Sequence, residues 1–218
     1  SLETLLRWRM EPGKLAAAQE FRGIFRDPSM SLSIRNFVLE NTIRQAAAWQ
    51  DDGHHFGRLS INTTAFDLCS GDLAGRLEAM LALYRLSPDM IEIEVPENAL
   101  YGPRAVEVGL AIEMLCYSGF SLALDNFGAT YAGLSALRRY PFSRLKIDPS
   151  LMRNALTNSV DQAIIRHVIG LGHDLGITIT ASGVERWKPP CSSGSTASRA
   201  ISSVSRKRRK WCRGSVMC

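Results

Sequence analysis

The sequence lacks the patterns that mark disulfide-rich and zinc-binding proteins. Its five cysteines form no Cys-x-x-Cys pair, and no histidine stands at ligand spacing from them. An odd number of widely scattered cysteines argues against a disulfide framework and against a zinc site. We expect Cys69 and Cys116 to pack as small apolar residues, which suits a reducing, cytoplasmic environment.

Long apolar runs and targeting signals are missing as well. No apolar run approaches the roughly 18 residues that a membrane-spanning helix needs, and no signal-peptide pattern is recognisable. The sequence begins with Ser1 and not with Met, so we expect a fragment of a longer protein. We predict no membrane segment in this chain, and an anchor or sensor on a preceding segment stays open.

Charge is unevenly divided along the 218 residues. Residues 186–218 hold nine of the 26 Lys and Arg residues and none of the 21 acids, so residues 1–185 carry −4 and the tail +9. The basic pI therefore does not indicate nucleic-acid binding by the body. The Ser-rich tail has no helix or strand periodicity, and we predict that it is disordered. Its basic run at 206–210 fits a nucleic-acid patch less well than out-of-frame or vector-derived sequence.

A short β-branched run followed by an amphipathic helix repeats through residues 1–185. The candidate strands are 58–62, 90–95, 120–125, 143–148 and 176–181. Helical spacing lies between them, as at Val108, Ile112 and Leu115. Steps of roughly 20–35 residues from strand to strand are typical of βα units and a parallel sheet. A doubly wound sheet and a (β/α)₈ barrel both fit this alternation.

Side-chain alternation favours the barrel. One face of the candidate strands is uniformly apolar and is expected to meet the helices. The other face is polar, with residues Ser60, Asn62, Glu92, Glu94, Ala123, Asp125, Lys146, Asp148, Thr178, Thr180 and Ser182. A doubly wound sheet would bury those carboxylates under helices at high energetic cost. A barrel points them inward and towards its C-terminal mouth, where such folds place their chemistry.

Polar residues end four successive candidate strands. Asn62, Glu94 and Asp125 offer oxygen ligands, and Lys146 adds an ammonium group. This combination suits a hard divalent cation and a phosphate. Any one of the four could be an ordinary polar residue at a strand end. Their shared face and shared end favour a functional site.

Six short motifs resemble those of the EAL domain family, in the family's order and spacing over residues 1–185. They are ETLLRW at Glu3–Trp8, Asn62 in SINTT, Glu94 and Glu97 in EVPEN, DNFGATY at Asp125–Tyr131, LKID at Leu145–Asp148, and ASGVE at Ala181–Glu185. The resemblance implies an α/β fold of the (β/α)₈ TIM-like type. The family's first strand precedes Glu3 and its last follows Glu185, so we expect a barrel incomplete at both ends, with exposed edges.

The resemblance also implies a chemistry, the hydrolysis of cyclic di-GMP with Mg²⁺ or Mn²⁺. Two metal ions would clamp an attacking water and a phosphate oxygen. Carried over by position, the metal ligands would be Glu3, Asn62, Glu94 and Asp125, with Asn126 as a weak ligand. Glu3 is thereby also part of the catalytic set.

Further roles follow from the same resemblance. Lys146 would orient the water or neutralise phosphate charge, Arg7 would grip a phosphate oxygen, and Asp148 would contact the substrate. Glu97 and Glu185 would brace the loop that follows Asp125.

Two departures from the family pattern fall on the reacting centre. Asn126 stands where the family has the second acid of DDFG, and Ser182 replaces the Glu of AEGVE, the proposed general base. A serine hydroxyl does not accept a proton near neutral pH, and loss of a positioned base typically lowers the rate by about 10²–10⁴-fold. We expect one ion to bind and the second to be held poorly.

Three functions fit this sequence. We favour a degenerate EAL domain that acts as a regulatory module in cyclic di-GMP signalling, with weak or no hydrolysis. The alternatives are an active metal-dependent phosphodiesterase and a truncated remnant without a function of its own. Cyclic di-GMP is the expected ligand, a protein partner or a homodimer stays open, and no nucleic acid is expected.

Overall fold

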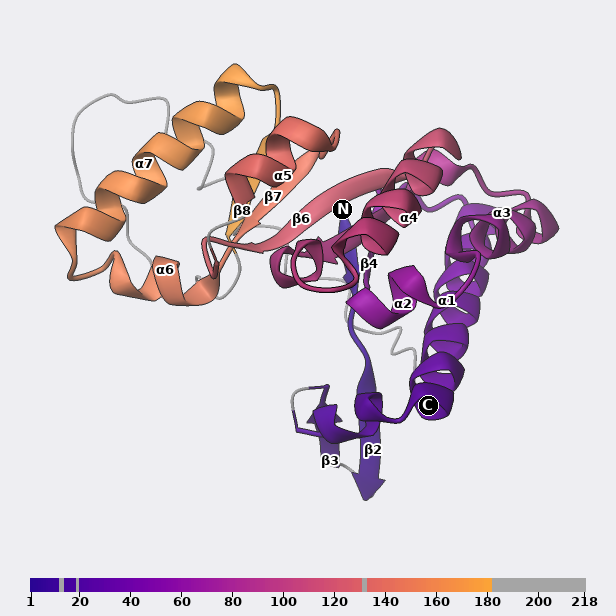
Figure 1. Ribbon diagram of the computed structural model, residues 1–218. Coiled ribbons are helices and arrows are strands. Elements are labelled where there is room, and N and C mark those ends of the chain that lie inside the picture. The colour runs from indigo at the N-terminus through magenta and orange to yellow at the C-terminus, as the bar shows by residue number, and fades with distance from the viewer. Residues whose placement is uncertain (12–13, 19, 131–132, 182–218) are drawn as a thin grey trace. The chain divides into compact units, whose positions relative to one another are not determined.

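The structure is a computed structural model that describes residues 1–11, 14–18, 20–130 and 133–181 (Figure 1). The chain divides into two compact units. Within the described ranges the first unit comprises Ser1–Val95 and Ala99–Leu122, and the second comprises Pro96–Asn98 and the residues from Ala123 onward. The predicted tail at 186–218, together with Ser182 and Glu185, lies outside the described residues.

The first unit contains a parallel sheet with strand order β1-β4-β5 and a separate antiparallel hairpin, β2-β3. Its elements are β1 (Leu2–Thr4), β2 (Arg7–Glu11), β3 (Lys14–Ala17), η1 (Arg22–Arg26), α1 (Pro28–Asp51), β4 (Leu59–Asn62), α2 (Ala65–Cys69), α3 (Leu73–Tyr84), η2 (Pro88–Met90), β5 (Ile91–Pro96, whose last residue belongs to the second unit) and α4 (Ala105–Tyr117). The register places Asn62, the last residue of β4, beside Glu94, which lies two residues before the end of β5. Two neighbouring strands thus carry oxygen-bearing side chains next to each other.

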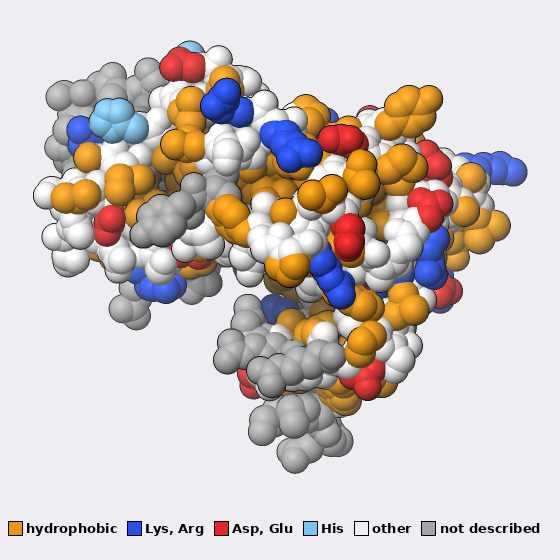
Figure 2. All heavy atoms as spheres, viewed as in Figure 1, with side chains coloured by type: hydrophobic (Ala, Val, Ile, Leu, Met, Phe, Trp, Pro, Cys, Tyr) orange, Lys and Arg blue, Asp and Glu red, His pale blue; other side chains and the backbone are white. Residues whose placement is uncertain are grey.

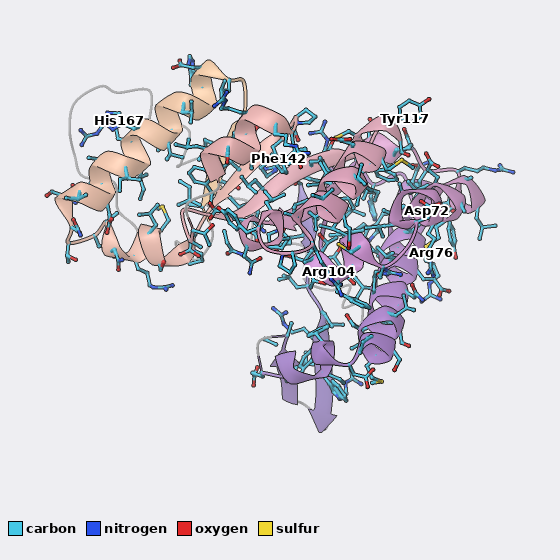
Figure 3. All side chains as sticks on the ribbon, in the orientation of Figure 1. Asp72, Arg76, Arg104, Tyr117, Phe142 and His167 are labelled. Carbon is cyan, nitrogen blue, oxygen red and sulfur yellow. The ribbon has the colours of Figure 1, made fainter. Side chains whose placement is uncertain are left out.

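Short polar side chains fix where the helices of the first unit begin. Asp27 precedes α1 and accepts hydrogen bonds from the backbone N–H groups of Ser29 and Met30. Asp72, labelled at α3 in Figure 3, accepts from the N–H of Gly75 at 2.8 Å. These caps satisfy N–H groups that have no partner within the helix.

Helix α4 shows why the amphipathic pattern predicted a helix. Its inner residues Val108, Ile112 and Leu115 are fully buried. On its other side Val106, Leu110, Met114 and Tyr117 are exposed, and in Figure 2 hydrophobic side chains lie at the surface over α4. Tyr117 projects away from the helix in Figure 3. Among the described residues, the outer side of α4 thus presents exposed apolar side chains beside the acids Glu107 and Glu113.

The second unit contains three parallel strands in the order β6-β7-β8. Its elements are η3 (Glu97–Leu100), which begins in this unit, β6 (Ser121–Phe127), whose first two residues belong to the first unit, α5 (Gly133–Arg139), β7 (Arg144–Ile147), α6 (Pro149–Asn154), α7 (Ser159–Asp174) and β8 (Thr178–Ala181). The β6–β7 register shifts between Leu124 and Phe127, where β6 carries an irregularity. Each of the five predicted strands is present, with bounds that differ by no more than two residues.

Both faces of the strands are more buried than the alternation alone indicates. The apolar residues Ile91, Ile93 and Leu124 are fully buried, as predicted. On the polar face, however, Glu92 is also fully buried, and the Ser60 hydroxyl donates to its carboxylate at 2.7 Å. A buried carboxylate needs such a donor because it has lost its hydration. Among the helices of the described ranges, none has the length and apolar character to cross a membrane.

Candidate functional site

The predicted site residues of the first unit gather at the ends of β1, β4 and β5. Glu3 lies in β1, a strand that the sequence analysis did not predict, and pairs in register with Ser60. The Nδ2 group of Asn62 donates to Glu3 Oε1 at 3.1 Å and to the Thr4 carbonyl at 3.4 Å. Because a carboxylate only accepts, this pairing fixes the orientation of the amide. Oδ1 is therefore the atom that Asn62 can offer to a cation.

Glu94 lies beside Asn62 and is 2% exposed. Its own carbonyl accepts from the backbone N–H of Thr63 at 3.1 Å and from the Thr63 hydroxyl at 2.8 Å. These two bonds tie the chain after β4 to β5. Asn62 and Glu94 therefore stand on neighbouring strands that are joined both by the sheet register and by these two bonds.

A second group, Asp125, Asn126 and Lys146, lies within the second unit. Lys146 Nζ is 3.4 Å from Asp125 Oδ1, and Asn126 Nδ2 donates to Asp125 Oδ2 at 2.7 Å. The side chains of Lys146 and Asp125 are only 11% and 17% exposed. Asn126 has φ +57°, in the left-handed region that Asn adopts more readily than most residues.

Glu97 holds the segment that follows this second group. Its Oε2 accepts from the backbone N–H groups of Gly128 at 3.1 Å and Thr130 at 3.0 Å, and its Oε1 accepts from Gly133 at 2.7 Å. Glu97 is 1% exposed. A Cβ atom at Gly133 would lie 2.3 Å from the Phe127 ring and 2.9 Å from Glu97 Oε1, so only glycine fits. One buried carboxylate thus serves three backbone donors.

The two predicted substrate-binding residues have structural partners of their own. Asp148 caps α6, because its Oδ1 accepts from the Ser150 N–H at 2.7 Å and from the Ser150 hydroxyl. Arg7 is exposed in β2, and its Nη1 donates to the Leu6 carbonyl at 2.8 Å. Their roles in binding a phosphate or the substrate stay predictions.

Both groups contain oxygen atoms of the kind that a divalent cation takes as ligands. No cluster of three or more His, Cys, Asp or Glu side chains among the described residues is arranged to hold a metal ion. Glu3, Asn62 and Glu94 nevertheless form a donor set of the hard oxygen type. The carboxylate of Asp125 is a further oxygen donor, and it already contacts Lys146 Nζ and the Asn126 amide. Which of these oxygens hold a metal ion stays a prediction.

Comparison with known proteins identifies the class. A sequence model of the EAL domain family matches residues 1–187, and the chain belongs to this family. It is 30% identical over 185 residues to the bifunctional diguanylate cyclase/cyclic di-GMP phosphodiesterase MucR of Pseudomonas aeruginosa, covering 84% of this chain and 27% of that protein. It is 26% identical over 188 residues to the cyclic di-GMP phosphodiesterase PdeR of Escherichia coli K12, covering 86% of this chain and 28% of that protein. The chain thus spans little more than a quarter of either relative.

Solved structures give the same class. The structure of the PaMucR phosphodiesterase in complex with c-di-GMP superposes with a TM-score of 0.77 at 30% identity, covering 84% of this chain and 74% of that one. The FimX EAL domain superposes with a TM-score of 0.74 at 21% identity, covering 84% of this chain and 73% of that one, and supports the fold alone. The predicted family and the predicted EAL-type α/β barrel class are confirmed.

Proposed function

We propose that this chain is a regulatory module of cyclic di-GMP signalling that binds the dinucleotide and hydrolyses it weakly or not at all. The pairing of Asp125 with Lys146 and Asn126 is the observation that carries the proposal. An active two-metal centre needs carboxylates whose charge is directed at the ions. At Asp125 one oxygen instead faces the Lys146 ammonium at 3.4 Å, and the other accepts from the Asn126 amide at 2.7 Å.

The chemistry left to the chain is correspondingly limited. A Mg²⁺ or Mn²⁺ ion held by Glu3, Asn62 and Glu94 would polarise a phosphate oxygen. Lys146 neutralises phosphate charge, and Glu97 keeps the segment after Asn126 in place through its three accepted hydrogen bonds. The general base is the missing part, because Ser182 stands at its position in the sequence. Binding therefore survives better than hydrolysis.

Regulation of this kind requires a second macromolecule. We propose that the chain acts in the cytoplasm through a protein partner or through a second copy of itself. The exposed face of α4 shows that apolar surface is present on the first unit. Large exposed apolar patches commonly mark interaction sites.

An active phosphodiesterase is the second candidate function. Glu3, Asn62, Glu94 and Lys146 are all retained, and relatives such as PdeR carry the name of cyclic di-GMP phosphodiesterases. A remnant without a function is the third candidate.

One pair of measurements separates the three. Isothermal titration with cyclic di-GMP, with and without Mg²⁺, reports binding, and chromatography of the linear dinucleotide after incubation with Mn²⁺ reports turnover. Binding with negligible turnover supports the regulatory module. Rapid turnover establishes that the chain is an active phosphodiesterase. A folded chain that does not bind cyclic di-GMP supports the third candidate, a remnant without a function.

A further inference from the structure

Arg35 of α1 is a buried cation that belongs to neither group of site residues. It is 8% exposed, and its Nη1 group donates to the Asp67 carbonyl at 3.1 Å and to the Ser70 hydroxyl at 2.5 Å. Both partners lie in or just after the last turn of α2, where backbone carbonyls have no partner within the helix. Arg35 thereby ties the C-terminal end of α2 to α1.

The helix that Arg35 holds follows closely on β4. Helix α2 has only five residues, and a helix of that length depends on contacts with the rest of the protein for its position. The Asp67 carboxylate holds its start, because Oδ2 accepts from the Thr64 N–H at 2.8 Å and from the Thr64 hydroxyl at 2.7 Å. Asp67 thus links the two ends of α2, since its carbonyl accepts from Arg35 and its carboxylate accepts from Thr64.

The start of α2 lies two residues beyond Asn62 of the candidate site. The intervening Thr63 donates its N–H and its hydroxyl to the Glu94 carbonyl at 3.1 and 2.8 Å. The Asn62 amide donates to Glu3 Oε1 at 3.1 Å. The segment that carries this amide is therefore fixed to β5 at Thr63 and to α2 at Thr64. A displacement of α2 would move the second of these fixed points.

Stability alone does not account for a cation at position 35. Among the described residues none accepts from Arg35 Nε or Nη2, none donates to Asp67 Oδ1, and all three atoms are buried. Burial lowers the pKa of the Arg35 guanidinium, while the nearby Asp67 carboxylate raises it. A buried polar atom without a partner is unfavourable, and replacing buried charges by apolar side chains is often neutral or stabilising. What Arg35 adds over an apolar side chain is the direction of its two bonds to α2.

We propose that Arg35 is a positioning residue for the candidate site, because it fixes α2 and, through Asp67 and Thr64, the segment that carries the Asn62 amide. The inference rests on the proposed function, since it takes Asn62 Oδ1 to serve a divalent cation. Arg35 acts through α2 and is not itself a ligand.

The first test uses Mn²⁺ alone, in calorimetric titrations at a temperature at which thermal melting shows every variant to be folded. Arg35→Met removes the charge and the donors of a side chain of similar length. It should weaken Mn²⁺ binding by about tenfold, as loss of residues that orient metal ligands does. Arg35→Lys keeps a positive charge and a donor, and should restore most of the affinity.

The matched control for this titration is Arg76→Met. Arg76, labelled in Figure 3, is exposed in α3 and donates to Asn36 Oδ1 of α1 at 2.9 Å. Its loss removes an arginine contact with α1 and leaves the bonds from Arg35 to α2 in place. The affinity for Mn²⁺ should therefore stay unchanged.

The second test needs no ligand. The side-chain amide of Asn62 gives a pair of nitrogen–proton NMR signals, assigned by their absence in Asn62→Asp. Arg35→Met should shift or broaden these signals, and Arg76→Met should leave them in place.

Either an unchanged Mn²⁺ affinity or an unchanged Asn62 signal in Arg35→Met would overturn the inference. A lower melting temperature of that variant, with both readouts unchanged, would show that Arg35 only stabilises the fold. If the unmodified chain bound no Mn²⁺, metal binding in the proposed function would fail, and the Asn62 signal would still decide the role of Arg35.

Discussion

Each of the two groups of site residues contains one amide hydrogen-bonded to one carboxylate. The groups differ in the residue that the next strand adds. In the first unit Asn62 donates to Glu3 at 3.1 Å, and the next strand contributes the acid Glu94. In the second unit Asn126 donates to Asp125 at 2.7 Å, and the next strand contributes the positively charged Lys146. The same amide–carboxylate pair is thus part of an acidic group in one unit and of a neutral group in the other. The third residue thus sets the formal charge of each group.

The segments that follow the two groups are also held differently. After β4 the chain is held locally, because Thr64 and Asp67 form a capping box at the start of α2. After β6 the chain is held from a distance in sequence, because Glu97 accepts from three backbone N–H groups beyond Asn126. Loss of the distant anchor should therefore have the larger effect.

If charge is what separates the two groups, restoring acids to the second should bring back catalysis. The double change Asn126→Asp with Ser182→Glu should raise the turnover of cyclic di-GMP in the presence of Mn²⁺ by about 10²-fold or more. Each change alone should do far less, because both act on one reacting centre. Chromatography of the linear dinucleotide measures the rate.

The matched control for that experiment is Asn126→Asp with Ser182→Gln, which adds the same bulk at position 182 without the charge. It should stay close to the rate of Asn126→Asp alone. Robust Mn²⁺-dependent turnover by the unmodified chain would contradict the assignment of the defect to these two positions.

The anchor of the second group gives the largest expected effect on stability. In Glu97→Gln one amide N–H₂ group faces a backbone N–H, so at least one buried donor loses its acceptor. The free energy of unfolding should fall on the order of 2 kcal/mol, measured by urea denaturation. The control Glu113→Gln changes an exposed acid of α4 and should stay within about 0.5 kcal/mol. An equal effect of the two changes would show that the Glu97 contacts are not needed.

The backbone conformation of the two asparagines can be tested with Gly and Ala variants. The difference in stability between the Gly and the Ala variant should have opposite signs at the two positions. Asn126 has φ +57°, so Asn126→Gly should be more stable than Asn126→Ala by about 1–2 kcal/mol. Asn62 lies in β4, so Asn62→Gly should be less stable than Asn62→Ala by about 0.5–1 kcal/mol. Thermal or urea denaturation of the four variants measures both differences. The same sign at both positions would refute the left-handed conformation of Asn126.

Much of the fold was predictable because alternation survives where strands are buried on one apolar face, as at Ile91, Ile93 and Leu124. Helix α1 was missed since its buried face includes Ser31, Arg35 and Thr42, which interrupt the apolar stripe. Strand β1 was missed because three residues are too few to show alternation.

The sequence predicted which residues belong to the candidate site, but not how their side chains pair. Alternation and the EAL-like motifs indicated Asp125 and Lys146, but not that they pair with each other. That pairing depends on the β6–β7 register, which shifts between Leu124 and Phe127. The left-handed backbone of Asn126 likewise has no signature beyond the residue type, since Asn also occurs in strands, as at Asn62. Register and local backbone are set by packing, and a single sequence does not report them.

The capping box of α2 in the first unit should make the smallest contribution to the free energy of unfolding among the contacts compared here. The Thr64 hydroxyl accepts from the Asp67 N–H at 3.2 Å and donates to Asp67 Oδ2 at 2.7 Å. Thr64→Ala removes both bonds and should lower the free energy of unfolding by about 1 kcal/mol, less than Glu97→Gln. Thr64→Ser keeps the hydroxyl and should retain most of the stability. If Thr64→Ala proved as damaging as Glu97→Gln in urea denaturation, the distinction between a local and a distant anchor would fail.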